Sequence, residues 1–155
     1  KLVMILVLLM FIGACAGSTG GGFKISRLLI LCKAIPKQLS LVIHPREVKV
    51  IRMDGKPIDH NTLRSTNVYL AIYFFILLVS TLLISVDNFN LTTNFTAVAS
   101  TLNNIGPGLD GVGPTRNFGM YSDFSKFVLM FDMLAGRLEL YPLLILFMPS
   151  LWRRK

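Results

Sequence analysis

The chain is organised around one short stretch, Thr101-Leu102-Asn103-Asn104-Ile105-Gly106-Pro107-Gly108-Leu109. It lies between two long apolar runs, residues 68–86 and 124–152, and each run is long enough to cross a bilayer. The stretch itself is too short and too rich in Gly, Pro and Asn to cross one. Irregular backbone survives at membrane depth only where protein buries it or where it lines a watery cavity, such as a carbonyl-lined ion filter. The pattern therefore predicts a re-entrant pore loop in a cation-conducting membrane protein.

The composition also favours a membrane protein. The 155 residues are 53% hydrophobic and 15% charged, with a mean hydropathy of +0.62, whereas soluble domains carry about a quarter charged residues. The two cysteines, Cys15 and Cys32, lie in or near apolar sequence without metal-ligand spacing, so we expect neither a disulfide nor a metal centre. No nucleophile–base pair, paired carboxylates or metal cluster stands out, so we expect neither an enzyme nor a cofactor.

Basic residues orient the chain, and they give the net charge of +8. Because they cluster in one loop without interleaved aromatic residues, we interpret them as a topology signal and expect no nucleic-acid binding. Residues 87–123 contain only one basic residue, Arg116, and should therefore lie outside the cell. The loop that we expect in the cytoplasm contains the basic residues Lys24, Arg27, Lys33, Lys37, Arg46, Lys49, Arg52, Lys56 and Arg64. Within this loop we expect a small β-hairpin over residues 47–59, with its turn at Asp54-Gly55.

The first 35 residues read as a membrane helix broken by glycines. The apolar run 2–12 would cover roughly 17 Å as a helix, about half of the hydrocarbon thickness. A small, flexible segment, residues 13–22, follows it, and residues 23–35 resume a helix with interspersed charges. The glycines also resemble the spacing of a phosphate-binding loop, but Phe23 and the late Lys24 break that motif. A GxxxG packing pair, Gly13 and Gly17, would explain only two of the glycines.

One complete span–loop–span unit follows. Residues 68–86 carry no charge and would extend about 28 Å as a helix. Residues 90–94 supply N-cap candidates for a short pore helix over 95–103, whose carbonyl end would favour a cation at the loop. The last run, 124–152, has bend candidates at Gly136 and Pro142. Its charges, Asp132, Arg137 and Glu139, mark either a pathway or a structural ion pair, and the two interpretations are compatible.

Three motifs carry a family likeness. Residues 11–24, Phe11-Ile12-Gly13-Ala14-Cys15-Ala16-Gly17-Ser18-Thr19-Gly20-Gly21-Gly22-Phe23-Lys24, resemble the intramembrane gating loop of Trk-type potassium uptake proteins, in the TrkH branch of the Trk/Ktr/HKT cation transporters. Residues 102–108 resemble the fourth selectivity-filter segment of that family. Met133-Leu134-Ala135-Gly136-Arg137-Leu138-Glu139, with residues 146–149 and Trp152, is similar to its final inner helix. The motifs fall in the family's order and cover nearly the whole chain.

The resemblance implies an all-α membrane protein built from four helix–pore-loop–helix repeats around one ion pathway. This chain would be a C-terminal piece of a longer protein. Residues 1–35 would be the inner helix of the third repeat, broken by its Gly-rich loop. Residues 36–66 would be a cytoplasmic linker with the hairpin, and residues 67–155 the complete last repeat.

The resemblance also implies site residues. The filter would comprise Asn103, Asn104, Ile105, Gly106, Pro107 and Gly108, and potassium, the substrate, would be bound by backbone carbonyls of Asn104, Ile105 and Gly106. The gate beneath it would comprise Gly13, Ala14, Cys15, Ala16, Gly17, Ser18, Thr19, Gly20, Gly21 and Gly22, with Arg137 facing it from the last helix. Two departures from the family's pattern are Ala14, where a further Gly is common, and Asp110, which could concentrate cations at the mouth.

The expected partners follow from the same resemblance. They are the lipid bilayer of the plasma (inner) membrane, crossed several times with the C-terminus in the cytoplasm, and the upstream pore repeats. We further expect a homodimer and a cytoplasmic nucleotide-binding regulatory subunit similar to TrkA. The expected function is potassium uptake. Two alternatives stay open: a sodium-permeable or sodium-coupled carrier of the same family, and a non-transporting anchor that recruits cytoplasmic partners through residues 33–64.

Overall fold

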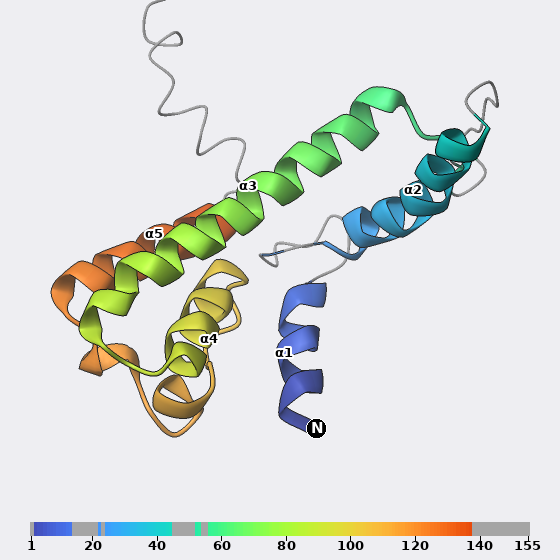
Figure 1. The fold of residues 1–155 in the computed structure, drawn as a ribbon. Coiled ribbons are helices and arrows are strands. Elements are labelled where there is room, and N and C mark those ends of the chain that lie inside the picture. The colour runs from blue at the N-terminus through green and yellow to red at the C-terminus, as the bar shows by residue number, and fades with distance from the viewer. Residues whose placement is uncertain (1, 14–21, 23, 45–51, 54–55, 138–155) are drawn as a thin grey trace, which may run out of the picture.

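The computed structural model describes residues 2–13, 22, 24–44, 52–53 and 56–137, and most of these are helical (Figure 1). This confirms the expected mainly α-helical class. The helices are α1 (Leu2–Ile12), α2 (Ile25–Ile43), α3 (His60–Ile84), α4 (Leu91–Leu102) and α5 (Asp123–Arg137). Three short 3₁₀ helices, η1 (Ser85–Asp87), η2 (Asp110–Val112) and η3 (Phe118–Met120), and two short strands, β1 (Arg52–Met53) and β2 (Lys56–Pro57), complete the described elements.

The long helix α3 is the axis of the structure. Among the described residues it is the one helix that is long and apolar enough to cross a membrane. It begins at His60, eight residues before the apolar run at 68, because a helix can continue past the membrane through polar residues such as Asn61 and Asn67. The helix α3 ends at Ile84 and continues directly into η1. η1 is capped by Asn88, whose φ of 55° is a left-handed conformation that asparagine tolerates.

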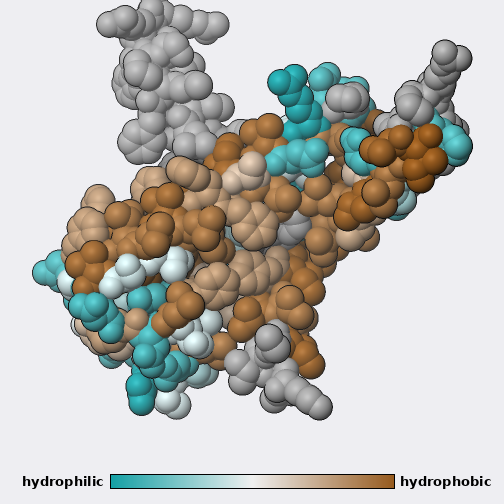
Figure 2. Space-filling view, viewed as in Figure 1, coloured by the Kyte–Doolittle hydropathy of each residue, from teal (hydrophilic) through white to brown (hydrophobic). Residues whose placement is uncertain are grey.

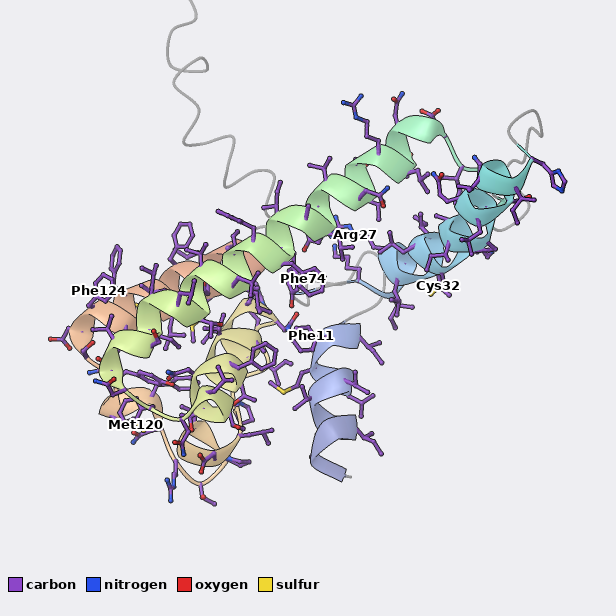
Figure 3. The ribbon with its side chains drawn as sticks, in the orientation of Figure 1. Phe11, Arg27, Cys32, Phe74, Met120 and Phe124 are labelled. Atoms are coloured by element: carbon purple, nitrogen blue, oxygen red, sulfur yellow. The ribbon has the colours of Figure 1, made fainter. Side chains whose placement is uncertain are left out.

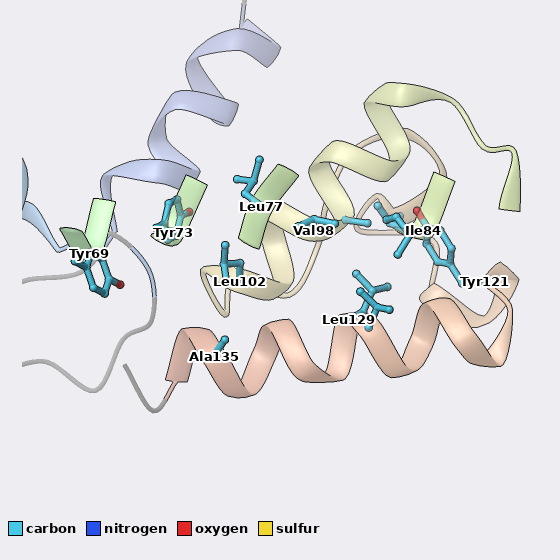
Figure 4. Packing of buried hydrophobic residues seen from close by; sticks show 12 residues of the cluster. Tyr69, Tyr73, Leu77, Ile84, Val98, Leu102, Tyr121, Leu129 and Ala135 are labelled. Atoms are coloured by element: carbon cyan, nitrogen blue, oxygen red, sulfur yellow. The ribbon is translucent and has the colours of Figure 1, made fainter. Parts of the chain in front are cut away.

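The core lies where α3, α4 and α5 pack together (Figure 4). Every third or fourth residue of α3 is buried, which is the periodicity of one helix face; these residues are Tyr69, Tyr73, Leu77, Ser80 and Ile84. They meet Val98 and Leu102 of α4 and Leu129 and Ala135 of α5. The short helix α4 is almost wholly buried from Thr93 onward, so it is the central element that the longer helices surround.

The opposite face of α3 is apolar and exposed. Large side chains on it include Phe74, Phe75, Leu78 and Leu82. Figure 2 shows a broad hydrophobic surface, with hydrophilic residues gathered at its two ends. In water such a surface would be a large unpaired patch, whereas a bilayer or further protein segments would cover it.

The helix α2 is longer than predicted. The sequence pattern placed a helix over residues 23–35, but α2 runs to Ile43 and includes Pro36. A proline inside a helix costs a backbone hydrogen bond. Ile30 and Ala34, which precede Pro36, are buried against Leu63 at the start of α3, whereas Pro36, Gln38 and Leu39 are exposed.

The two strands pair antiparallel, with Arg52 opposite Pro57 and Met53 opposite Lys56. Residues 45–51 and 54–55 lie outside the described residues. The longer hairpin expected over 47–59 and its cytoplasmic position therefore stay predictions.

The short helix before the central loop also starts earlier than predicted. The expected range was 95–103, whereas α4 begins at Leu91, with Asn90 at the N-cap position but without a side-chain capping bond. The last run is described only to Arg137, so the bend candidate Pro142 and the charge of Glu139 lie outside the described residues. Gly136 lies within the described helix α5.

Candidate pore loop

The chain reverses direction at the end of α4 and runs back beside this helix. The turn begins at Asn103 and Asn104, and Asn104 adopts a left-handed φ of 54°. Five residues after Asn104, the Leu109 N–H donates to Thr96 Oγ1 of α4 at 3.1 Å. The predicted loop is therefore a hairpin-like return that starts at the carbonyl end of a short helix.

Three hydroxyl side chains of α4 hold the returning loop. The Ser100 hydroxyl donates to the Gly106 carbonyl at 2.7 Å, and Thr96 accepts from Leu109. The Thr93 hydroxyl donates to Asp110 Oδ2 at 3.0 Å and accepts from the Gly111 N–H at 3.4 Å. The sequence analysis did not identify these three hydroxyl residues as a set, although their spacing of three and four residues is typical of side chains on one face of a helix.

The middle of the loop is exposed. Asn104, Ile105, Gly106 and Pro107 are all exposed, whereas Gly108 is buried. Gly106 has a φ of 109°, which residues with a Cβ rarely adopt, and nothing lies within 4 Å of where its Cβ would be. Gly108 is needed for space instead, since a Cβ there would lie 3.2 Å from the Thr96 carbonyl oxygen.

Asn103 differs from the other predicted filter residues because its side chain points into the protein. Its Nδ2 donates to the Ala99 carbonyl at 2.8 Å, and its Oδ1 accepts from the Tyr73 hydroxyl of α3 at 3.0 Å. Only 5% of the residue is exposed. The side chain therefore ties the start of the loop to α3 and to the last turn of α4.

The structure brings one end of the predicted gate to this point. Gly22 is buried with a φ of 82°, and a Cβ on it would overlap Asn103 Oδ1. Gly13 ends α1 with a φ of 69°. Residues 14–21 lie outside the described residues, and Arg137 is exposed at the end of the described part of α5. The expected contact between Arg137 and the gate thus stays a prediction.

The last helix approaches the loop closely. A Cβ on Gly136 would overlap the Leu102 carbonyl oxygen, and it would lie 2.7 Å from Asn104 Nδ2. Asn104 Nδ2 also donates to the Met133 carbonyl at 3.2 Å. Gly136 therefore allows α5 to pack closely against the end of α4, which differs from its predicted role as a bend point.

Asp132 of α5 is fully buried. Its Oδ1 accepts from the Ser80 hydroxyl of α3 at 2.7 Å. This bond joins two helices that are distant in sequence. The Ser80 hydroxyl is uncharged, so this bond is not the structural ion pair that the sequence analysis offered as one interpretation of the charges in the last run. A role for Asp132 in an ion pathway stays a prediction.

Asp110 lies at the far end of the loop. It is exposed, adopts a φ of 54° and accepts the hydrogen bond from Thr93. Asp110 and Arg116 both line an open cavity of about 290 Å³. Because a positive side chain lines the same cavity, the expected concentration of cations by Asp110 stays a prediction.

Comparison with known proteins gives a consistent result. The family model TrkH, described as "Cation transport protein", matches residues 1–154. "Trk system potassium uptake protein TrkH" of Vibrio parahaemolyticus is 39% identical over 98% of this chain and 31% of its own length. "Trk system potassium uptake protein TrkG" of Escherichia coli is 32% identical over 97% of this chain and 31% of its own length.

A solved structure matches equally well. The "Crystal Structure of the Potassium Transporter TrkH from Vibrio parahaemolyticus" superposes with a TM-score of 0.86 at 38% identity, over 98% of this chain and 32% of that one. The chain thus spans about a third of the length of the proteins that it resembles.

Proposed function

Because the chain belongs to the TrkH family of cation transport proteins, we propose that it forms one part of a potassium uptake protein in a cell membrane. The proposal covers the whole protein's activity, of which this chain would supply the last of four filter loops and the segment beneath it. The named relatives are potassium uptake proteins of the Trk system.

One observation carries the proposal: the exposed turn at 104–107 starts at the carbonyl end of α4 and is held there by Ser100 and Thr96. The carbonyl end of a helix carries partial negative charge and favours a cation. Backbone carbonyls of Asn104, Ile105 and Gly106 would replace part of the hydration shell of potassium. The Gly106 carbonyl keeps a second lone pair for this role while Ser100 occupies the first.

The glycine-rich residues 13–22 would form the gate. Gly22 lies against the start of the loop, which supports a position of this segment below the filter. Arg137 would place a positive charge in the cation route and act as an electrostatic barrier. The gate would then open when the segment and Arg137 move apart.

The partners and the location complete the proposal. We place the protein in the inner membrane with residues 24–64 and the C-terminus in the cytoplasm, as the distribution of Lys and Arg favours. A second copy of the protein and a nucleotide-binding regulatory subunit would assemble with it. The name "Trk system" that the relatives carry fits a multi-component system.

Uptake by the complete protein tests the function. Cells that lack other potassium uptake systems would express it, and rubidium uptake would be measured with and without competing sodium. We expect saturable rubidium uptake that sodium inhibits only weakly. Equal uptake of sodium would favour the sodium-permeable alternative, and no cation uptake by well-expressed protein would favour the membrane anchor.

A further inference from the structure

Three parts of the chain meet at the side chain of Asn103. This residue ends α4: its backbone N–H and its Nδ2 both donate to the Ala99 carbonyl, at 3.1 and 2.8 Å. Its Oδ1 accepts from Tyr73 of α3 at 3.0 Å. Because the amide is buried and has a partner at both ends, it cannot turn without breaking one of these bonds.

The third part is the end of the glycine-rich segment. The backbone at Gly22 lies so close to Asn103 Oδ1 that a single added carbon would overlap it. The Tyr69 hydroxyl, one helical turn before Tyr73, donates to the Gly22 carbonyl at 3.4 Å. The guanidinium of Arg27, just after the segment, lies 3.8 Å from the centre of the Tyr69 ring (Figure 3). Two tyrosines of α3 thus hold Gly22 and Asn103 side by side.

We propose that Asn103 is a positioning residue that couples Gly22, the described end of the glycine-rich segment, to the pore loop. The coupling rests on the proposed function. Asn104 follows Asn103 directly and begins the exposed turn, so a rotation of the Asn103 side chain or backbone changes the direction of the next carbonyls. When Gly22 moves away, Asn103 loses the neighbour that closes one side of its site, and the turn becomes less restrained.

A second hydrogen bond from a tyrosine hydroxyl to an asparagine side chain, at the other end of α4, provides a matched control. The Tyr121 hydroxyl donates to Asn94 Oδ1 at 3.0 Å, and both residues are buried. Burial raises the pKa of Tyr121 to about 12, with a further contribution from the negative charge of Asp87, so the hydroxyl stays protonated and donates. Tyr121 and Asn94 hold the first turn of α4, far along the helix from Gly22. Loss of this bond reports on helix anchoring alone.

The experiment compares Tyr73→Phe with Tyr121→Phe in the complete protein, reconstituted in lipid vesicles. The readouts are the ratio of rubidium to sodium uptake and the temperature of thermal unfolding. Each variant loses one tyrosine–asparagine bond, so we expect similar losses of stability. We expect only Tyr73→Phe to change the uptake ratio, by about fivefold, the equivalent of about 1 kcal/mol for one hydrogen bond.

The outcomes separate the coupling from the function. A wild-type protein without rubidium uptake contradicts the proposed function and the coupling together. Wild-type uptake combined with an unchanged ratio in Tyr73→Phe, or with equal changes in both variants, overturns the coupling alone.

A double-mutant cycle tests the contact of Gly22 with Asn103. We expect Gly22→Ala to lower rubidium uptake strongly, and to lower it less when Asn103→Ala has removed the overlapping oxygen. Part of the loss should persist, because alanine at a positive φ remains strained. Equal effects of Gly22→Ala in both backgrounds would show that the two residues act independently and would overturn the coupling.

Discussion

At the scale of single residues, the loop uses its two glycines for different reasons. Gly106 is exposed and has open space around it, but its backbone conformation disfavours any side chain. Gly108 is buried between Thr96 and Val112 and is required for its small size. A substitution at Gly106 therefore changes the backbone path of the loop, whereas one at Gly108 changes its packing on α4.

We expect Gly106→Ser in the complete protein to lower potassium uptake or its selectivity over sodium by roughly tenfold. A residue with a Cβ costs about 1–2 kcal/mol in a left-handed conformation, so the loop would adopt another path. The measurement is rubidium uptake in cells that lack other uptake systems, with and without sodium.

Gly119→Ser is the control for this prediction. Gly119 is exposed, and its nearest contact is the flexible side chain of Asn117. Gly111 would be a poor control because it packs closely against Met120 and Thr93. Wild-type behaviour of both variants would show that residues 103–108 are not a filter.

We expect Arg137→Ala to raise cation uptake or to remove its regulation. A guanidinium at membrane depth costs about 3 kcal/mol unless it is paired or hydrated, so if Arg137 lies at that depth we expect it to act in the pathway. The measurement is cation flux at matched protein levels, with Arg137→Lys as the variant that keeps the charge. If well-expressed Arg137→Ala showed unchanged flux, only the interpretation of Arg137 as part of a structural ion pair would remain.

At the scale of secondary-structure elements, α4 holds the loop on one of its sides and packs against α5 on another. One side carries the hydroxyls that hold the returning loop. On another side α5 comes close enough for Gly136 to touch the Leu102 carbonyl at the end of α4. The loop conformation thus depends on helix packing as well as on its own sequence.

We expect Gly136→Ala to destabilise the protein by about 1–3 kcal/mol, the usual cost of overpacking a well-packed site. The obstacle is the backbone carbonyl of Leu102, which cannot move aside as a flexible side chain would. If Gly136 served only as a bend point, alanine would instead stabilise the helix by up to about 1 kcal/mol. Thermal unfolding of the complete protein in detergent separates the two results.

At the scale of the whole molecule, the chain has a broad apolar surface between two polar ends (Figure 2). The exposed polar loop that follows α4 contains Asn117, and the start of α3 contains the exposed Arg64. If α3 crosses the bilayer, these two positions lie on opposite sides. The excess of basic residues before α3 predicts that Arg64 lies inside the cell.

Cysteine labelling tests this orientation. In a background without Cys15 and the exposed Cys32, Arg64→Cys and Asn117→Cys would be treated with an impermeant thiol reagent. We expect labelling of position 117 in intact cells, and labelling of position 64 only after the membrane is opened. Labelling of position 64 from outside would reverse the topology.

The sequence by itself determined the features that depend on neighbouring residues. The apolar run 2–12 coincides with α1, and the run after residue 68 lies in the one described helix suited to cross a membrane. The position of the central loop followed from Gly, Pro and Asn after a short helical segment. Apolar length, helix-breaking residues and charge asymmetry are local properties, so they can be recognised without coordinates.

Only the tertiary structure decided which residues hold the loop in place. The partners of Asn103 and Asp132 lie 30 and 52 residues away in the sequence, and Gly22 meets Asn103 from another helix boundary. Likewise α2 contacts the distant Leu63 through Ile30 and Ala34. Such contacts depend on how helices are placed in space, and one sequence pattern is compatible with many placements. The position of the loop was therefore predictable, whereas the distant side chains that hold its start were not.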